Sequence, residues 1–110
     1  MTKPSYNERY LVQEIVHIHK ILANPSRLRI LLLLADAPYN VSEISLKLGL
    51  EQSATSHQLS ILRTHQLVKQ DRSGRSIIYK IGDKHILQLL ALSVSHAQEL
   101  EGTQLHDTKS

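Results

Sequence analysis

The sequence predicts a single domain that is mainly helical and carries one β-hairpin near its end. The chain has 110 residues, a usual length for one domain. Apolar residues recur at helical spacing in five segments, and two strand-like segments around a Ser-Gly pair lie between the fourth segment and the fifth. We therefore expect the order helix, helix, helix, helix, hairpin, helix.

The first two helices are predicted from apolar spacing and from a capping signal between them. Residues 7–22 carry apolar side chains three or four positions apart, as a helix with one buried face requires. Asn24 is a favoured N-cap, and Pro25 suits the first helical position. The helix expected over residues 25–36 is apolar on most of its faces, so we expect it at the centre of the domain.

The third and fourth helices are joined by a glycine turn. Residues 41–48 follow Asn40, which resembles a capping box together with Glu43. Gly49 is a typical C-terminal stop. The fourth helix, expected over residues 53–66, is small, polar or basic apart from a few apolar positions. Two short helices joined in this way predict a helix-turn-helix.

The hairpin and the last helix complete the fold. Residues 67–72 and 75–81 are predicted as strands with a turn at Ser73-Gly74, and both carry cations. A strongly apolar helix follows over residues 83–100. The fold class is therefore a winged helix-turn-helix, mainly α with a β-hairpin wing.

We expect this domain to span residues 8–100, between a flexible N-terminus at 1–7 and a flexible tail at 101–110. The final helix is apolar enough to need a partner, so we expect a homodimer.

The composition excludes several classes of protein. The chain has no cysteine, which excludes disulfides, thiolate metal sites and thiol redox sensing. It has no apolar run near 18 residues and no apolar signal core at its start, so we expect no membrane contact and a cytoplasmic location. A net charge of +3 is compatible with binding nucleic acid. Seven histidines are a high count and point to imidazole chemistry.

The fourth helix and the hairpin together predict a site for double-stranded operator DNA. A recognition helix exposes short polar groups that hydrogen-bond base edges, while cations and hydroxyls hold phosphates. The alternative is that this helix face and this hairpin are ordinary solvent-exposed surface that contacts no DNA. The candidate DNA-binding residues are Ser53, Thr55, Ser56, His57, Gln58, Arg63, Arg72 and Arg75.

The last helix carries two sets of candidate metal ligands, Asp83 with His85 and His96 with Glu99. On an ideal helix the two histidines lie about 20° apart around the axis but about 16 Å apart along it. Bonds from Zn²⁺ to nitrogen and oxygen are only about 2 Å, so one chain cannot bring both sets to one metal ion.

Two copies packed antiparallel about a two-fold axis bring the start of one last helix to the end of the other. Each metal then receives Asp83 and His85 from one protomer and His96 and Glu99 from its partner, with two alike sites per dimer. Two imidazoles and two carboxylates suit tetrahedral Zn(II), with Co(II) as a surrogate and Ni(II) less favoured.

Simpler interpretations of these residues stay open. Asp83 alone is more often a helix N-cap, and it can hold both roles. Isolated histidines and glutamates are usually surface residues. We interpret His17 and His19 as structural or surface residues, since they lie on nearly opposite faces of the first helix, and His65 as a surface residue. His106 in the tail is a candidate extra ligand for a six-coordinate metal.

With these motifs, the chain resembles the ArsR/SmtB family of metal-sensing repressors over residues 20–100. The segments that carry the resemblance run from Asn24 to Leu31, from Gln52 to Leu59, over Leu67-Val68 and through the hairpin residues Gly74-Arg75 and Ile78-Tyr79, with the Asp-x-His and His-x-x-Glu pairs of the last helix.

The resemblance implies a repressor that leaves its operator when metal binds. It implies that His96 uses its second nitrogen to bond a carbonyl near His57, which links metal site and recognition helix. Where the family's thiolate sensors place cysteines, this chain has Val41-Ser42-Glu43, so thiolate-type sensing is not expected.

The sequence thus predicts a dimeric transcriptional repressor that Zn(II) at inter-subunit sites releases from DNA. The alternatives are a nickel- or cobalt-sensing repressor, with His106 as a ligand, and a repressor of this fold that senses no metal. A zinc hydrolase is a poorer fit, because four ligands leave no open position and no nucleophile with its base lies nearby. We therefore expect neither an enzyme nor a small organic substrate.

Overall fold

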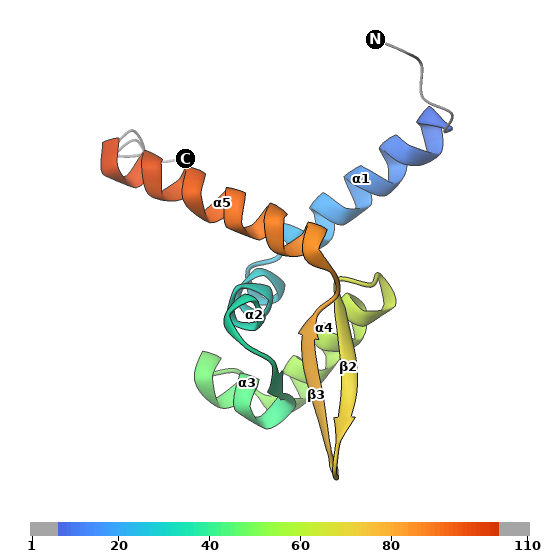
Figure 1. The fold of residues 1–110 in the computed structure, drawn as a ribbon, viewed down its shortest axis with the longest axis vertical. Coiled ribbons are helices and arrows are strands. Elements are labelled where there is room, and N and C mark those ends of the chain that lie inside the picture. Colours follow the sequence, from blue (N-terminus) through green and yellow to red (C-terminus); the bar gives the residue numbers. More distant parts are fainter. Residues whose placement is uncertain (1–6, 104–110) are drawn as a thin grey trace.

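The computed structural model describes residues 7–103 as five helices and a small antiparallel sheet, a winged helix-turn-helix (Figure 1). The predicted flexible ends fall largely outside these residues, as does His106. The elements are α1 (Glu8–Leu22), α2 (Pro25–Asp36), β1 (Tyr39–Asn40), α3 (Val41–Leu48), α4 (Gln52–Thr64), β2 (Val68–Ser73), β3 (Ser76–Ile81) and α5 (Lys84–Thr103).

The capping signals in the sequence place the helix boundaries as predicted. The Asn24 side chain accepts a hydrogen bond from the Arg27 backbone N–H at 3.1 Å and begins α2. Asn40 and Glu43 form a complete capping box, with bonds of 2.8 and 2.9 Å in the two directions. Gly49 ends α3 in the left-handed conformation, with φ 67°. The helix-turn-helix prediction is confirmed.

The sheet contains one strand that the sequence did not reveal. The two-residue strand β1 pairs with β3, where Tyr39 lies opposite Tyr79, so the strand order is β1-β3-β2. The wing hairpin turns at Gly74-Arg75, because Ser73 lies opposite Ser76 and Gly74 has φ 63°. The predicted turn was one residue too early. Through β1, the wing is hydrogen-bonded to the segment that leads into α3.

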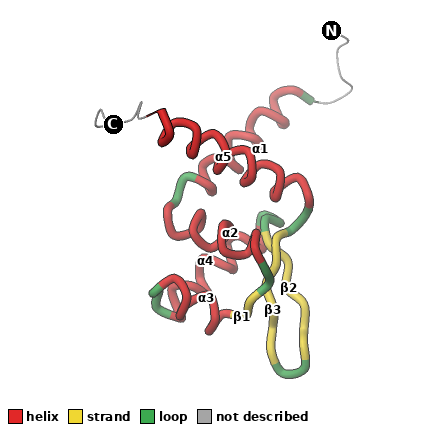
Figure 2. The backbone as a smooth tube through the Cα atoms, turned by 60° about the vertical axis from the view of Figure 1, so that its left-hand side comes forward, coloured by secondary structure: helices red, strands yellow, loops and turns green. Residues whose placement is uncertain are grey.

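The core is built around α2, as its apolar faces predicted (Figure 2). Ile30 and Leu31 are fully buried, and they pack in one cluster with side chains from every other helix and from the wing. The remaining buried apolar members of the cluster are Ile21, Leu34, Ile44, Leu59, Leu62, Leu67, Val68 and Leu90. The cluster therefore fixes α4 and the wing against α2.

The helices α1 and α5 project from this core on the side opposite α3 and the wing tip (Figure 1). The Cα radius of gyration is 16.3 Å, above the ~13 Å expected of a compact domain of this length. The helix α5 runs to Thr103, three residues beyond its predicted end. None of the helices described over residues 7–103 is both long and apolar enough to cross a membrane.

Candidate functional site

The helix α4 has one buried face and one exposed polar face. Thr55, Leu59 and Leu62 recur at helical spacing and are fully buried against the core. The other face carries small polar and basic side chains, all exposed. We call Ser53, Ser56, His57, Ser60 and Arg63 the recognition face. Ser53, Ser56, Ser60 and Arg63 follow at spacings of three and four, and His57 lies one turn from Ser53 and Ser60, so the five share one side of the helix.

Thr55 does not belong to this face, although the sequence analysis placed it among the candidate DNA contacts. Its side chain is fully buried, and its hydroxyl donates to the Glu51 carbonyl at 2.9 Å. Counting small polar residues as exposed led to the error, because a threonine hydroxyl can be satisfied by the preceding helical turn. Thr55 therefore supports the helix from inside. Ser60 lies on the exposed face, and the sequence analysis had not selected it.

Gln58 lies at the edge of the recognition face and is half-buried. Its side-chain oxygen accepts a hydrogen bond of 2.8 Å from the Nε–H of Arg27 on α2. A guanidinium donor makes this a charge-assisted bond, stronger than one between neutral groups. The amide nitrogen of Gln58 is the end of the side chain that this contact leaves available. The contact holds the orientation of α4 relative to the central helix.

The wing presents its cations at the tip. Arg75 lies in the turn and Arg72 near the end of β2, both are exposed, and neither has an ion pair within residues 7–103. Nearer the base, the Lys80 ammonium lies 2.7 Å from Asp71, with both side chains largely exposed. The wing tip thus carries two exposed positive charges that no acidic side chain of the described residues compensates.

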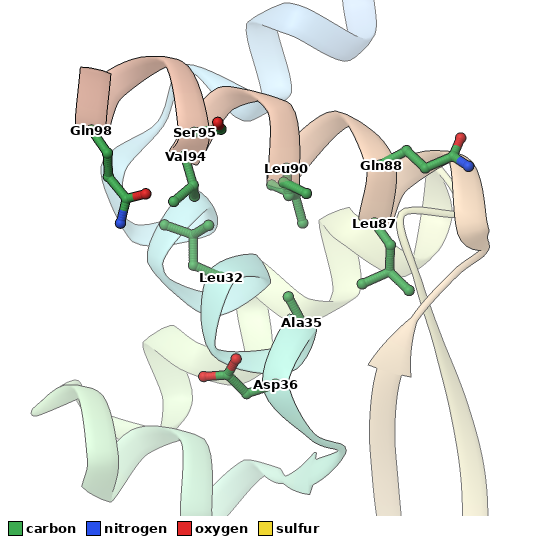
Figure 3. Close-up of a pocket in the computed structure, with 10 residues that line it drawn as sticks. Leu32, Ala35, Asp36, Leu87, Gln88, Leu90, Val94, Ser95 and Gln98 are labelled. Atoms are coloured by element: carbon green, nitrogen blue, oxygen red, sulfur yellow. The ribbon is translucent and has the colours of Figure 1, made fainter. Parts of the chain in front are cut away.

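A second surface is apolar and belongs to α1 and α5. Tyr10, Val12, Ile15 and Val16 of α1 are all 45% or more exposed, and Leu92 of α5 is 70% exposed. Between α2 and α5 lies an apolar pocket of about 550 Å³, whose lining includes the facing side chains of Leu32, Leu90 and Val94 (Figure 3). Several large apolar side chains exposed on two neighbouring helices are typical of a surface that another molecule covers.

Asp83 and His85 lie together at the start of α5. Asp83 Oδ1 accepts hydrogen bonds from the backbone N–H groups of His85 at 2.9 Å and Ile86 at 3.1 Å, so it is the N-cap of the helix. The same oxygen lies 3.7 Å from His85 Nδ1. Both side chains are more than half exposed. The cap leaves Oδ2 free, so the two residues offer a carboxylate and an imidazole on the same side of the chain.

His96 and Glu99 are exposed near the other end of α5, and His96 lies about 16 Å along the axis from His85. Among residues 7–103, no three histidine or acidic side chains come close enough together to hold a metal ion. The chain by itself thus presents two separated half-sites, while the joining of half-sites from two protomers stays a prediction. The donor types fit Zn²⁺, since it binds imidazole and carboxylate.

The structure also brings together two histidines that the sequence analysis treated as isolated. His17 of α1 and His65, which ends α4, have their Nε2 atoms 3.4 Å apart. They are 48 positions apart in the sequence, so no local pattern indicates the contact. His57 is exposed on the recognition face, and its predicted part in a relay from His96 stays a prediction.

Comparison with known proteins identifies the chain's relatives. Residues 24–70 match the family described as "Bacterial regulatory protein, arsR family". The chain is 48% identical over 79 residues to the HTH-type transcriptional regulator NmtR of Mycobacterium tuberculosis, covering 72% of this chain and 66% of NmtR. It is 31% identical over 98 residues to the HTH-type transcriptional repressor SmtB of the same organism, covering 89% of this chain and 73% of SmtB. The chain belongs to the arsR family.

Structural comparison agrees with this assignment. The homodimeric winged helix-turn-helix domain of Mb0332 from Mycobacterium bovis, described as a possible ArsR-family transcriptional regulator, superposes with a TM-score of 0.79 at 28% identity, covering 99% of this chain and all of that one. The arsR family consists of regulatory proteins, not of enzymes.

The match to the arsR family covers only part of the chain. It spans α2 to the start of β2 and so contains the recognition face, but it does not reach α5. The alignment with NmtR covers just under two thirds of that protein. The argument for a metal site in this arsR-family chain therefore comes from its own donors on α5.

Proposed function

We propose that the chain is a metal-responsive transcriptional repressor, which binds operator DNA as a homodimer and is released when Zn(II) binds at inter-subunit sites. The observation that carries the proposal is the pair of half-sites at opposite ends of the same exposed helix. Each half-site offers one imidazole and one carboxylate, and only a second copy of α5 can complete either of them.

The apolar surface of α1 and α5 supports the dimer. A chain of 110 residues buries limited surface by itself, so association adds core and stability. The exposed side chains of Leu92 and Val16 and the apolar pocket beside α2 are regions that a second copy would cover. The superposing Mb0332 domain is a homodimer. A two-fold axis would place two recognition faces on one side of the assembly.

DNA binding is supported by the recognition face and by the wing tip. Ser56 and His57 are exposed at the middle of that face, and Arg72 and Arg75 extend the positive surface along the hairpin. Hydroxyl, imidazole and amide groups suit base edges in the major groove, while the arginines suit phosphates. A dimer reads two half-sites separated by about one helical turn, roughly 34 Å.

The metal would be held by Asp83 and His85 of one protomer and by His96 and Glu99 of the other. When bound, it supplies a rigid cross-link between the two α5 helices. His96 then uses its second ring nitrogen to donate to a backbone carbonyl, as ligating histidines usually do. We propose that this carbonyl belongs to the α4 region, and His57 remains the candidate relay.

One contact of the described chain supports such coupling. The Gly82 backbone N–H donates to the Leu67 carbonyl at 2.9 Å, which ties the residue before Asp83 to the segment that ends α4. A displacement at the start of α5 would thereby reach the segment that follows the recognition helix. The expected coupling between metal and DNA is about 1–3 kcal/mol, and it is reciprocal.

The test is an equilibrium titration of operator DNA, selected from a random duplex library, with and without saturating zinc. We expect zinc to weaken binding by about 5- to 150-fold. The double variant His85→Ala/His96→Ala should bind the same DNA without responding to zinc, because both side chains are exposed and the fold does not depend on them. His19→Ala is the control, since its Nδ1 bonds the Ile15 carbonyl at 2.9 Å within α1.

The outcomes separate the proposal from its alternatives. Unchanged affinity of the wild-type dimer at saturating zinc would rule out zinc release. A zinc response that survives in the double variant would place the switch elsewhere. A monomer at micromolar concentration in sedimentation experiments would remove the basis of the inter-subunit sites.

A further inference from the structure

We propose that His17 and His65 form a second zinc site, within one protomer and independent of the α5 half-sites. His17 lies on α1 and His65 directly follows α4, so the pair spans the two helices (Figure 1 shows both). Their Nε2 atoms are 3.4 Å apart, and the rings meet edge to face with centroids 4.5 Å apart.

The separation of the two nitrogens fits a shared tetrahedral metal ion. Two ligands at about 2.0–2.1 Å from Zn²⁺ and at the tetrahedral angle lie about 3.3–3.4 Å apart. A hydrogen bond between two nitrogens is shorter, about 2.9–3.0 Å at its most frequent length. The observed 3.4 Å matches the tetrahedral spacing. With both Nε2 atoms aimed at one tetrahedral ion the ring centroids would lie about 5 Å apart. The ring centroids are 4.5 Å apart, so the rings must turn slightly to bind it.

The surroundings provide room and a third donor. The two histidines line a pocket of about 310 Å³ together with Glu14, Thr64 and Gln66. Glu14 precedes His17 by one helical turn on the same face of α1. Its carboxylate must rotate to reach the metal, since no group of three such donors is already assembled within residues 7–103. Water would fill the remaining position, because both imidazoles are exposed.

The site differs from the α5 sites in what it would link. It shares no ligand with Asp83, His85, His96 or Glu99, and it needs no second protomer. A zinc ion held here ties α1, which carries exposed apolar side chains, to the end of α4, which carries the recognition face. The chain would then bind two zinc ions per protomer.

The experiment starts from the full chain carrying His85→Ala and His96→Ala, in which the α5 half-sites lack their imidazoles. Zinc is titrated against a chromophoric chelator, and imidazole nitrogens are followed by NMR. We expect one zinc per protomer, with the Nε2 resonances of His17 and His65 shifting together. Adding His17→Ala or His65→Ala should weaken binding at least tenfold. Adding His19→Ala should not, because that imidazole is not part of the pocket.

Several results would overturn the site. These are zinc binding unchanged by both substitutions, no zinc bound in the starting variant, or Nε2 resonances that stay in place while zinc binds. If an alanine variant fails to fold by circular dichroism, His65→Gln keeps a polar side chain and removes the imidazole. The starting variant lacks the α5 imidazoles, so its zinc binding does not depend on the α5 sites. Absence of the His17–His65 site would therefore not contradict zinc release through α5, and absence of zinc release would not contradict the His17–His65 site.

Discussion

Gly82→Ala probes the junction between the wing and α5. A Cβ added at Gly82 would lie 2.3 Å from the Gln66 carbonyl oxygen, 3.1 Å from the Leu67 carbonyl carbon and 3.2 Å from that of Gln66. All three atoms belong to the backbone, so no flexible side chain can move aside. To relieve the overlap, the segment after α4 and the start of α5 must separate by about 1 Å.

The expected cost has two parts. Overpacking of this kind typically costs about 1–3 kcal/mol. The separation also weakens the hydrogen bond of 2.9 Å from the Gly82 N–H to the Leu67 carbonyl, worth about 1 kcal/mol. We therefore expect Gly82→Ala to lower the free energy of unfolding by about 2–4 kcal/mol. At a urea m-value of about 2 kcal/mol/M, the unfolding midpoint falls by roughly 1–2 M.

The assay is urea unfolding followed by far-UV circular dichroism, with all proteins at one concentration because association affects the midpoint. Gly102→Ala is the matched control, since a Cβ there meets nothing within 4 Å and α5 is already helical at that point. The control should unfold at the wild-type midpoint or slightly above it. If Gly82→Ala unfolds together with the control, the close approach between Gly82 and Gln66 is refuted.

Four further changes test single contacts. Leu59→Ala empties a fully buried position of α4 and should cost about 2–5 kcal/mol in urea unfolding; a cost below 1 kcal/mol would contradict that burial. Asp83→Ala should lower the free energy of unfolding by about 1 kcal/mol through loss of the α5 cap. Asp83→Asn should retain the cap and lose zinc affinity. Equal stability of the two variants would argue against capping. A double-mutant cycle of Arg27→Ala and Gln58→Ala should give a coupling free energy of unfolding of at least about 0.5 kcal/mol. Additive effects of the two substitutions would contradict the hydrogen bond between these side chains. Arg75→Ala should weaken operator binding and reduce the slope of log affinity against log salt by about 1, while an unchanged slope would exclude a phosphate contact at the wing tip.

The parts of the fold that the sequence predicts are those encoded within a few residues. Asn24 before Pro25, Asn40 before Glu43, and Gly49 each act on the helix beside them, so their effect does not depend on the rest of the molecule. The central position of α2 follows equally directly, because a helix that is apolar on most faces has to be covered on most faces.

The parts that the sequence does not predict depend on distant contacts or on hidden polar groups. The strand β1 is two residues long and exists only because β3 lies beside it. A pattern of polar and apolar residues counts Thr55 as exposed. Its hydroxyl bonds the Glu51 carbonyl, and this bond allows the polar side chain to be buried. His17 and His65 meet only after α1 and α4 have packed on the same core. Candidate ligands on one helix can be recognised from spacing, whereas ligands from two helices require the fold.

The two proposed zinc sites act on the same end of α4. Gln66 lines the pocket beside His65 and also the pocket that contains Asp83, so the segment that ends the recognition helix lies between them. At the middle of the helix, Gln58 is held to α2 through Arg27. A helix fixed at its middle and displaced at its end changes direction as a rigid rod, which moves its first residues as well. Metal bound far from Ser53 and Ser56 would therefore alter their approach to DNA without touching either residue.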